Sequence, residues 1–135
     1  MQQRTLKCEG RVCNWQVLYA SAHWTVRNKL AHDFHALVRA AIDPEQEPFV
    51  RQVDILVQAF SRSQPPDPDN VCAKVYIDGL KGWWIGEDTP TWVRQVTTQS
   101  TKGPEDCVLI TVTEVEGAPI LPWDDKYSPS EDTEV

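Results

Sequence analysis

The chain reads Pro66-Asp67-Pro68-Asp69-Asn70-Val71-Cys72-Ala73-Lys74 where a strand-like segment gives way to a helix-like one. Each proline restricts its own φ angle and disfavours helical geometry in the residue before it, so an extended chain is expected here. Because alternate side chains of an extended chain leave on the same side, Asp67 and Asp69 are expected to point toward one place. Asp69 or Asn70 is a good N-cap, which predicts a helix from there to about Leu80.

Two convergent carboxylates with a lysine nearby are suited to metal-assisted hydrolysis of a phosphodiester. Mg²⁺ takes hard oxygen ligands, usually one or two carboxylates together with water and substrate phosphate. The metal lowers the pKa of its bound water, and a nearby cation stabilises the charge of the transition state. Asp-Pro-Asp-Asn is also ordinary turn chemistry before a capped helix, and the tetrapeptide by itself favours that simpler interpretation.

The pattern continues on both sides of Lys74. The residues are Pro65-Pro66-Asp67-Pro68-Asp69-Asn70-Val71-Cys72-Ala73-Lys74-Val75-Tyr76-Ile77-Asp78-Gly79-Leu80-Lys81-Gly82, then Gly86-Glu87-Asp88-Thr89-Pro90. This arrangement resembles the RusA family of Holliday junction resolvases, in which an Asp-x-Asp-Asn segment opens a helix carrying a lysine and a short loop delivers a final acidic pair. Upstream, Asn14-Trp15-Gln16-Val17-Leu18-Tyr19 and His23-Trp24 are also similar, so the resemblance spans about residues 4–115.

The resemblance implies a magnesium-dependent endonuclease, with Mn²⁺ as a substitute ion, that resolves four-way junctions in branched DNA by paired cuts. It implies that Asp67, Asp69 and Asp88 bind the metal and that Lys74 assists catalysis. A homodimer is expected, since a two-fold dimer supplies two identical sites. Lys74 follows Asn70 by four steps where the family has three. Because one residue rotates a helical side chain by about 100°, this departure puts the role of Lys74 in question.

Hydrophobic periodicity predicts one α+β domain, with a mixed sheet of about four strands and two main helices. At 135 residues the chain is long enough to bury a single ordinary core. The strands are expected at residues 4–9, 50–61, 91–99 and 107–115, the last two forming an antiparallel hairpin, and the helices at 25–42 and 69–80. Residues 1–115 form the RusA-like domain in this division, and residues 116–135 form an acidic, proline-containing, flexible tail.

The helix at 25–42 has Thr25 as its expected N-cap and one apolar stripe expected to face the core. The stripe consists of Val26, Leu30, Phe34, Leu37, Val38 and Ala41. The opposite side carries Asn28, His32, His35 and Arg39, which is either a solvated face or a ridge that contacts phosphates. The predicted DNA contacts are Asn14, His32, His35, Arg39 and Asn70.

The net charge of −7 argues against a nucleic-acid partner, but the distribution of charge weakens this objection. Residues 114–135 carry seven acids and one base, whereas residues 1–113 carry thirteen acids and twelve bases. A divalent metal at the three aspartates would make the body neutral or slightly positive. We therefore expect weak, salt-sensitive affinity for DNA.

The four cysteines contain no CxxC pair and match no standard zinc spacing, so reduced, buried thiols in a cytoplasmic protein are expected. No run has the length of a membrane helix or the character of a secretory signal, and no membrane partner is expected. Small members of the resembled family commonly come from phages or prophages, which would place this protein in a bacterial host cell. Trp83, Trp84 and Trp92 flank the predicted site and either stack on unpaired bases or serve the core or a dimer interface.

Two functions of other classes remain open. One is a DNA-binding relative of the family that has lost cleavage, which the additional residue before Lys74 suggests. The other is an acidic protein-interaction domain, in which Asp67 and Asp69 only form a turn and a cap.

Overall fold

The structure is a computed structural model that describes residues 2–20 and 23–123. It is an α+β domain with a four-stranded mixed sheet, as the sequence predicts. The strands are β1 (Gln3–Glu9), β2 (Val53–Ser61), β3 (Val93–Lys102) and β4 (Cys107–Glu114). The helices are α1 (Trp15–Ala20), α2 (Trp24–Ala41) and α3 (Ala73–Leu80), and a short 3-10 turn, η1 (Pro68–Asn70), precedes α3.

The strand order is β1-β4-β2-β3, with β4 antiparallel to both β1 and β2 and with β2 parallel to β3. The predicted hairpin of the last two strands is therefore wrong, because β2 lies between them. The connection from β3 to β4 crosses the end of β2, where the Gly103 N–H donates to the Ser61 carbonyl at 2.9 Å. The two partly apolar faces of β2 indicated a central strand. The structure places β2 between β4 and β3, so β3 and β4 do not pair.

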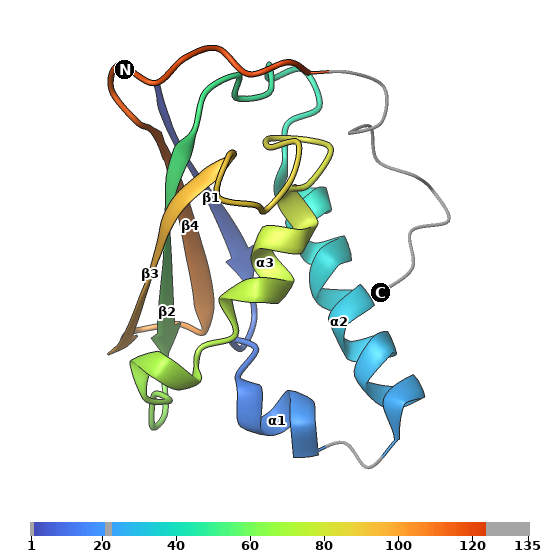
Figure 1. Ribbon diagram of the computed structural model, residues 1–135. Coiled ribbons are helices and arrows are strands. Elements are labelled where there is room, and N and C mark those ends of the chain that lie inside the picture. The colour runs from blue at the N-terminus through green and yellow to red at the C-terminus, as the bar shows by residue number, and fades with distance from the viewer. Residues whose placement is uncertain (1, 21–22, 124–135) are drawn as a thin grey trace.

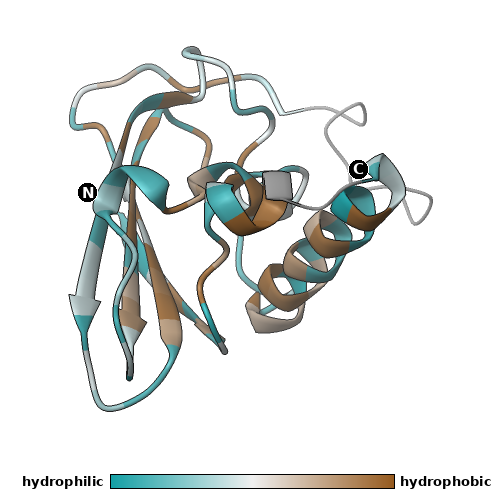
Figure 2. Cartoon of the chain, turned by 90° about the horizontal axis from the view of Figure 1, so that it is seen from below, coloured by the Kyte–Doolittle hydropathy of each residue, from teal (hydrophilic) through white to brown (hydrophobic). Residues whose placement is uncertain are grey.

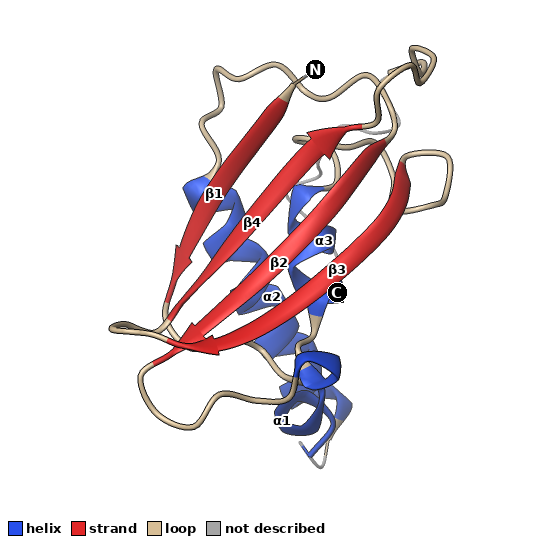
Figure 3. Ribbon diagram, turned by 90° about the vertical axis from the view of Figure 1, so that its left-hand side faces the viewer, coloured by secondary structure: helices blue, strands red, loops and turns tan. Residues whose placement is uncertain are grey.

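The core lies between the inner face of the sheet and the helices. Every second residue of β2, from Val53 to Ser61, is buried on that face. Figure 1 shows helix α3 between the sheet and α2, and Figure 2 shows hydrophobic residues on both the strands and the helices. None of the described helices covers the opposite face of the sheet, as Figure 3 shows. The site described below consequently belongs to the helical side of the molecule.

Helix α2 is rotated relative to its predicted orientation. Its fully buried residues are His35 and Val38, whereas Val26 and Leu37, both assigned to the core stripe, are 49% and 43% exposed. The rotation brings Val38 against Gly79 of α3, where an added β-carbon would lie 2.7 Å from the Val38 Cβ atom. The N-cap is His23 rather than Thr25, because the His23 ring accepts a hydrogen bond from the Thr25 N–H.

The chain remains on the domain after β4 as far as Trp123. Ala118 is buried, Ile120 forms a β-bridge with Arg51, and the Trp123 ring meets the Trp92 ring edge to face at 5.7 Å. The tail predicted from residue 116 is therefore packed over its first eight residues. Residues 124–135 lie outside the described part of the chain. None of the described helices is long and apolar enough to cross a membrane.

Candidate functional site

The segment between β2 and α3 folds differently from its prediction. Asp67 is extended, but Pro68–Asn70 form a 3-10 turn, so the two aspartates do not follow one extended chain. Pro68 occupies the first position of this turn, where a missing N–H costs nothing and the fixed φ angle suits a helix. Val71 then forms a β-bridge with Asn14, and α3 begins only at Ala73. The predicted continuous helix from residue 69 to 80 is thus wrong.

This interruption changes the position of Lys74. The helix begins at Ala73, directly after the segment in which Val71 bridges to Asn14, so Lys74 lies in the first turn of α3. The Lys74 Nζ atom lies 3.5 Å from Oδ2 of Asp78, one helical turn later, and 3.9 Å from Oδ2 of Asp88 in the following loop. Lys74 therefore meets both an ordinary helix partner and the predicted catalytic acid.

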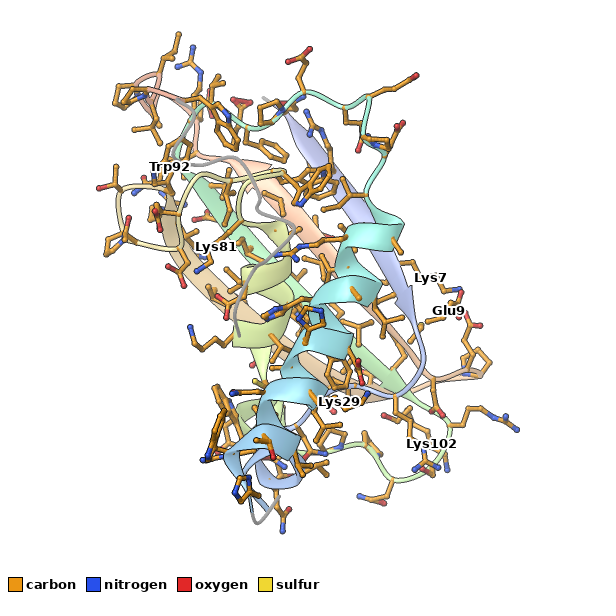
Figure 4. All side chains as sticks on the ribbon, turned by 90° about the vertical axis from the view of Figure 1, so that its right-hand side faces the viewer. Lys7, Glu9, Lys29, Lys81, Trp92 and Lys102 are labelled. Carbon is orange, nitrogen blue, oxygen red and sulfur yellow. The ribbon has the colours of Figure 1, made fainter. Side chains whose placement is uncertain are left out.

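Lys81 completes a cluster of four charges. Its Nζ atom lies 3.4 Å from Oδ1 of Asp78 and 4.0 Å from Oδ2 of Asp88. Two ammonium groups thus face two carboxylates at the end of α3, with Lys81 labelled in Figure 4. We name Lys74, Asp78, Lys81 and Asp88 the α3 charge cluster. Asp78 and Lys81 were not among the predicted site residues, although their spacing from Lys74 places all three on neighbouring turns.

The loop that carries Asp88 is anchored in the core by tryptophan. Trp84 is buried, its carbonyl accepts a hydrogen bond from the Phe49 N–H at 2.9 Å, and its ring meets the Phe49 ring edge to face. Gly82 adopts a φ of +83°, which favours glycine, and its N–H donates to the Ile85 carbonyl. Trp84 and Trp92 are both buried, so these two side chains belong to the core on which this loop rests.

Besides the two lysines, Asp78 has a third neighbour, His35 of α2. The Nε2 atom of His35 lies 3.8 Å from Oδ2 of Asp78, and the His35 residue is only 4% exposed. Burial lowers the pKa of His35, and the carboxylate of Asp78 opposes that shift. The ring is therefore neutral at neutral pH. Helix α2 turns His35 inward against α3, so the buried ring offers little surface for the predicted contact with DNA.

The remaining predicted residues are spread around this cluster. Asp67 and Asp69 are exposed, and their side chains form no hydrogen bond or ion pair with the described residues. The turn that carries them lies beside β3, where the Thr98 hydroxyl donates to the Pro68 carbonyl at 2.8 Å. In residues 2–20 and 23–123, no three His, Cys, Asp or Glu residues are placed to hold a metal ion together. The structure brings Lys74 to Asp88 but does not gather all three predicted ligands.

The donor set nevertheless suits magnesium. Asp67, Asp69 and Asp88 offer hard carboxylate oxygens, and Mg²⁺ commonly takes only one or two protein carboxylates with water and phosphate completing its shell. Asp67 and Asp69 are free to serve as such ligands, since neither carboxylate forms an ion pair with a described lysine, arginine or histidine.

Asn14 and Asn70 organise α1. The Oδ1 atom of Asn14 accepts a hydrogen bond from the Val17 N–H at 2.7 Å, which caps the helix. The Oδ1 atom of Asn70 accepts one from the Gln16 N–H at 3.1 Å. The other two predicted DNA contacts differ in exposure, since His32 is exposed and Arg39 is half-buried.

A cavity of about 230 Å³ adjoins the charge cluster. Lys74 and Asp78 form one side of it, and Arg27 and Asn28 of α2 and Trp15 of α1 form another. The cavity thus presents two cations, an amide and an aromatic ring beside the carboxylates. Arg27 was missed in the sequence because it follows the expected core residue Val26. The chain matches no model of a known protein family, and no curated protein matches its sequence.

Proposed function

We propose that this protein is a magnesium-dependent endonuclease that resolves branched DNA, acting on four-way junctions as a homodimer. The observation that carries this proposal is the proximity of Lys74 to Asp88, at 3.9 Å between Nζ and Oδ2. These two residues are fourteen positions apart and are the lysine and the final acid of the RusA-like pattern. Their meeting supports a catalytic assignment despite the additional residue before Lys74.

The proposed ligands are the carboxylates of Asp67, Asp69 and Asp88. When bound, magnesium would supply an activated water molecule and stabilise negative charge on the phosphate. Lys74 would donate a hydrogen bond to a phosphate oxygen as charge accumulates there. Asp78 orients both lysines of the cluster, and the neutral ring of His35 lies against its inner side.

The charges of this region support a requirement for a divalent cation. Asp67, Asp69, Asp78 and Asp88 contribute four negative charges, and Lys74, Lys81 and Arg27 contribute three positive charges. The region is therefore negative without a metal, and one Mg²⁺ ion would make it positive and attractive to phosphate. The cavity lined by Arg27, Asn28 and Lys74 offers donors for the neighbouring phosphates.

Paired cutting requires two sites, which is why the proposal includes a homodimer. The exposed side chains of Val17 and Trp24 offer apolar surface of the kind that a second copy covers. Because the substrate is DNA, the proposal places the protein in the cytoplasm, in a bacterial host if it is of phage or prophage origin.

A second candidate is a DNA-binding relative without cleavage. The observation that favours it is that no described group of three acidic, histidine or cysteine residues is placed to hold a metal ion. Cleavage of a synthetic four-way junction in the presence of Mg²⁺, compared with a linear duplex of the same sequence, distinguishes the two functions. Binding without cleavage would favour this second candidate.

A further inference from the structure

Cys13 and Cys72 lie directly opposite each other in the structure. Asn14 and Val71 form an antiparallel β-bridge, so the register pairs the residue before Asn14 with the residue after Val71. The Cys72 N–H donates to the Cys13 carbonyl at 2.9 Å, which is one of the two hydrogen bonds of a hydrogen-bonded residue pair in an antiparallel ladder. The α-carbons of such pairs are about 5.5 Å apart, within the range of about 4.4–6.8 Å that disulfides require.

Both thiols are free and buried, and each acts on the pKa of the other. Cys72 is the N-cap residue of α3, at the end of the helix where the backbone N–H groups of Lys74 and Val75 have no helical partner. The hydrogen bond from Cys13 and these two backbone donors lower the pKa of Cys72. The hydrogen bond to Cys72, followed by burial, raises the pKa of Cys13. Of the two thiols, Cys72 therefore has the lower pKa.

Cys72 is also reached from the cavity beside α3. It lines the same space of about 230 Å³ as Trp15, Arg27 and Lys74, although its side chain is otherwise buried. This space admits a small oxidant. Arg27 and Lys74 line it as cations, and Asp78, which lines it as well, raises the pKa of Cys72.

We propose that Cys13 and Cys72 are an oxidisable dithiol that a small hydroperoxide converts into a disulfide. The Cys72 sulfur attacks one peroxide oxygen, the O–O bond breaks, and an alcohol or water leaves, so that Cys72 becomes a sulfenic acid. The Cys13 sulfur then attacks the Cys72 sulfur, the S–O bond breaks, and water leaves with the Cys13 proton. Two thiols and one hydroperoxide thus give one disulfide, one alcohol or water molecule, and one further water.

The other two cysteines provide an internal control. Cys8 pairs with Val108 on the inner face of the sheet, whereas Cys107 pairs with the neighbouring Glu9. Since successive side chains of a strand point to opposite faces, Cys8 and Cys107 lie on opposite faces and cannot be bridged without moving a strand.

The test uses the full chain and hydrogen peroxide at about one equivalent. Free thiols are then alkylated and the protein is digested with trypsin without reduction. The sequence places each cysteine in a separate tryptic peptide, at residues 8–11, 12–27, 63–74 and 103–126. We expect the 12–27 and 63–74 peptides to be joined with loss of two hydrogens, while the other two peptides are alkylated. Four alkylated peptides, or joining that involves residues 8–11 or 103–126 equally often, would overturn the proposal.

Two variants separate the roles of the thiols. The Cys8→Ser/Cys107→Ser variant should form the disulfide as the natural chain does. The Cys13→Ser variant should stop at a sulfenic acid that dimedone labels on peptide 63–74. Labelling confined to another peptide would contradict the role of Cys72. The oxidised natural chain should also melt about 5–15 °C higher and return to its starting Tm after reduction, because the bridge closes a long loop. A lower Tm would show that the pair is not placed for bonding.

Discussion

The Nζ atom of Lys74 lies 3.9 Å from Oδ2 of Asp88, although a helix and a loop separate the two residues. The bridge between Asn14 and Val71 sets where α3 begins, and buried Trp84 fixes the loop that returns Asp88 to it. The pair therefore depends on two structural features that lie outside the sequence motif. The following predictions test its role and the packing behind it.

Replacing Asp67 or Asp69 by asparagine should abolish junction cleavage while leaving the fold intact. Both side chains are exposed and form no hydrogen bond or ion pair with the described residues, so their loss disturbs no packing. Removing one negative charge also reduces repulsion of phosphate, so binding in metal-free buffer should equal or exceed that of the natural protein. Cleavage assays in low millimolar Mg²⁺ and gel-shift assays in EDTA measure the two effects. Near-normal cleavage by both variants would refute their assignment as ligands.

The variant Lys74→Met should lose turnover by about a hundredfold or more, because it removes a positioned cation from the transition state. Methionine keeps an unbranched stem and a good helix propensity. The matched control is Lys29→Met on the exposed side of α2 (Figure 4), since Lys29 also pairs with an acid four residues later, at 2.9 Å. The control should retain turnover. Equal rates for both variants would reduce Lys74 to a surface residue, with an effect on stability of only a few tenths of a kcal/mol.

His35 should make the protein less stable as the pH falls. Burial lowers its folded-state pKa below the ordinary 6.5, with Asp78 acting against this shift and Arg39, His32 and Lys81 acting with it. As the pH falls, His35 therefore takes up its proton at a higher pH in the unfolded chain than in the folded protein. The stability contribution is complete above pH 6.5 and is lost as the pH decreases through the folded-state pKa. Urea unfolding at pH 7.5 and 5.5 measures the difference.

The His35→Gln variant should show a smaller loss of stability between these two pH values than the natural protein. The comparison variant is His32→Gln, which changes an exposed histidine of the same helix; because His32 acts with burial on the pKa of His35, this change should reduce the pH dependence less than His35→Gln does. If both variants keep the full dependence, another group is responsible.

Gly79→Ala should destabilise the protein although alanine is the better helix former. The new β-carbon would lie 2.7 Å from Cβ and 2.9 Å from Cγ1 of Val38, so α2 and α3 must separate. Overpacking of this kind costs about 1–3 kcal/mol. The control, Ala36→Gly at an exposed position of α2, measures helix propensity alone and should cost about 1 kcal/mol. A Gly79→Ala protein as stable as the natural one would show that the two helices are not in such close contact.

Local patterns predicted the elements well where each residue's environment follows from its neighbours. Strand β2 shows regular alternation, and its two partly apolar faces indicated its central position. The end of α3 at Leu80 and the extent of α2 were also close to expectation. The pairing of β3 was not predictable in this way, because a short connection can join strands that are neighbours or strands separated by another.

The candidate site shows the same division. The proximity of Lys74 and Asp88 was expected from a resemblance, but its structural basis is the long-range bridge from Asn14, which no local pattern reveals. The inward rotation of α2 places Val38 against Gly79 of α3, a feature of two helices rather than one. Asp78 and Lys81 were within reach of sequence analysis, since their spacing from Lys74 places them on adjacent turns.

The most direct test of the proposed activity compares cleavage of a synthetic four-way junction with cleavage of a linear duplex of the same sequence, with Mg²⁺ and with EDTA. We predict paired cuts in opposite strands of the junction that require Mg²⁺, little cutting of the duplex, and no cutting by the Asp67→Asn variant. A folded protein that leaves the junction intact in both Mg²⁺ and Mn²⁺, or that cuts equally well after the Asp67→Asn change, would contradict the proposal.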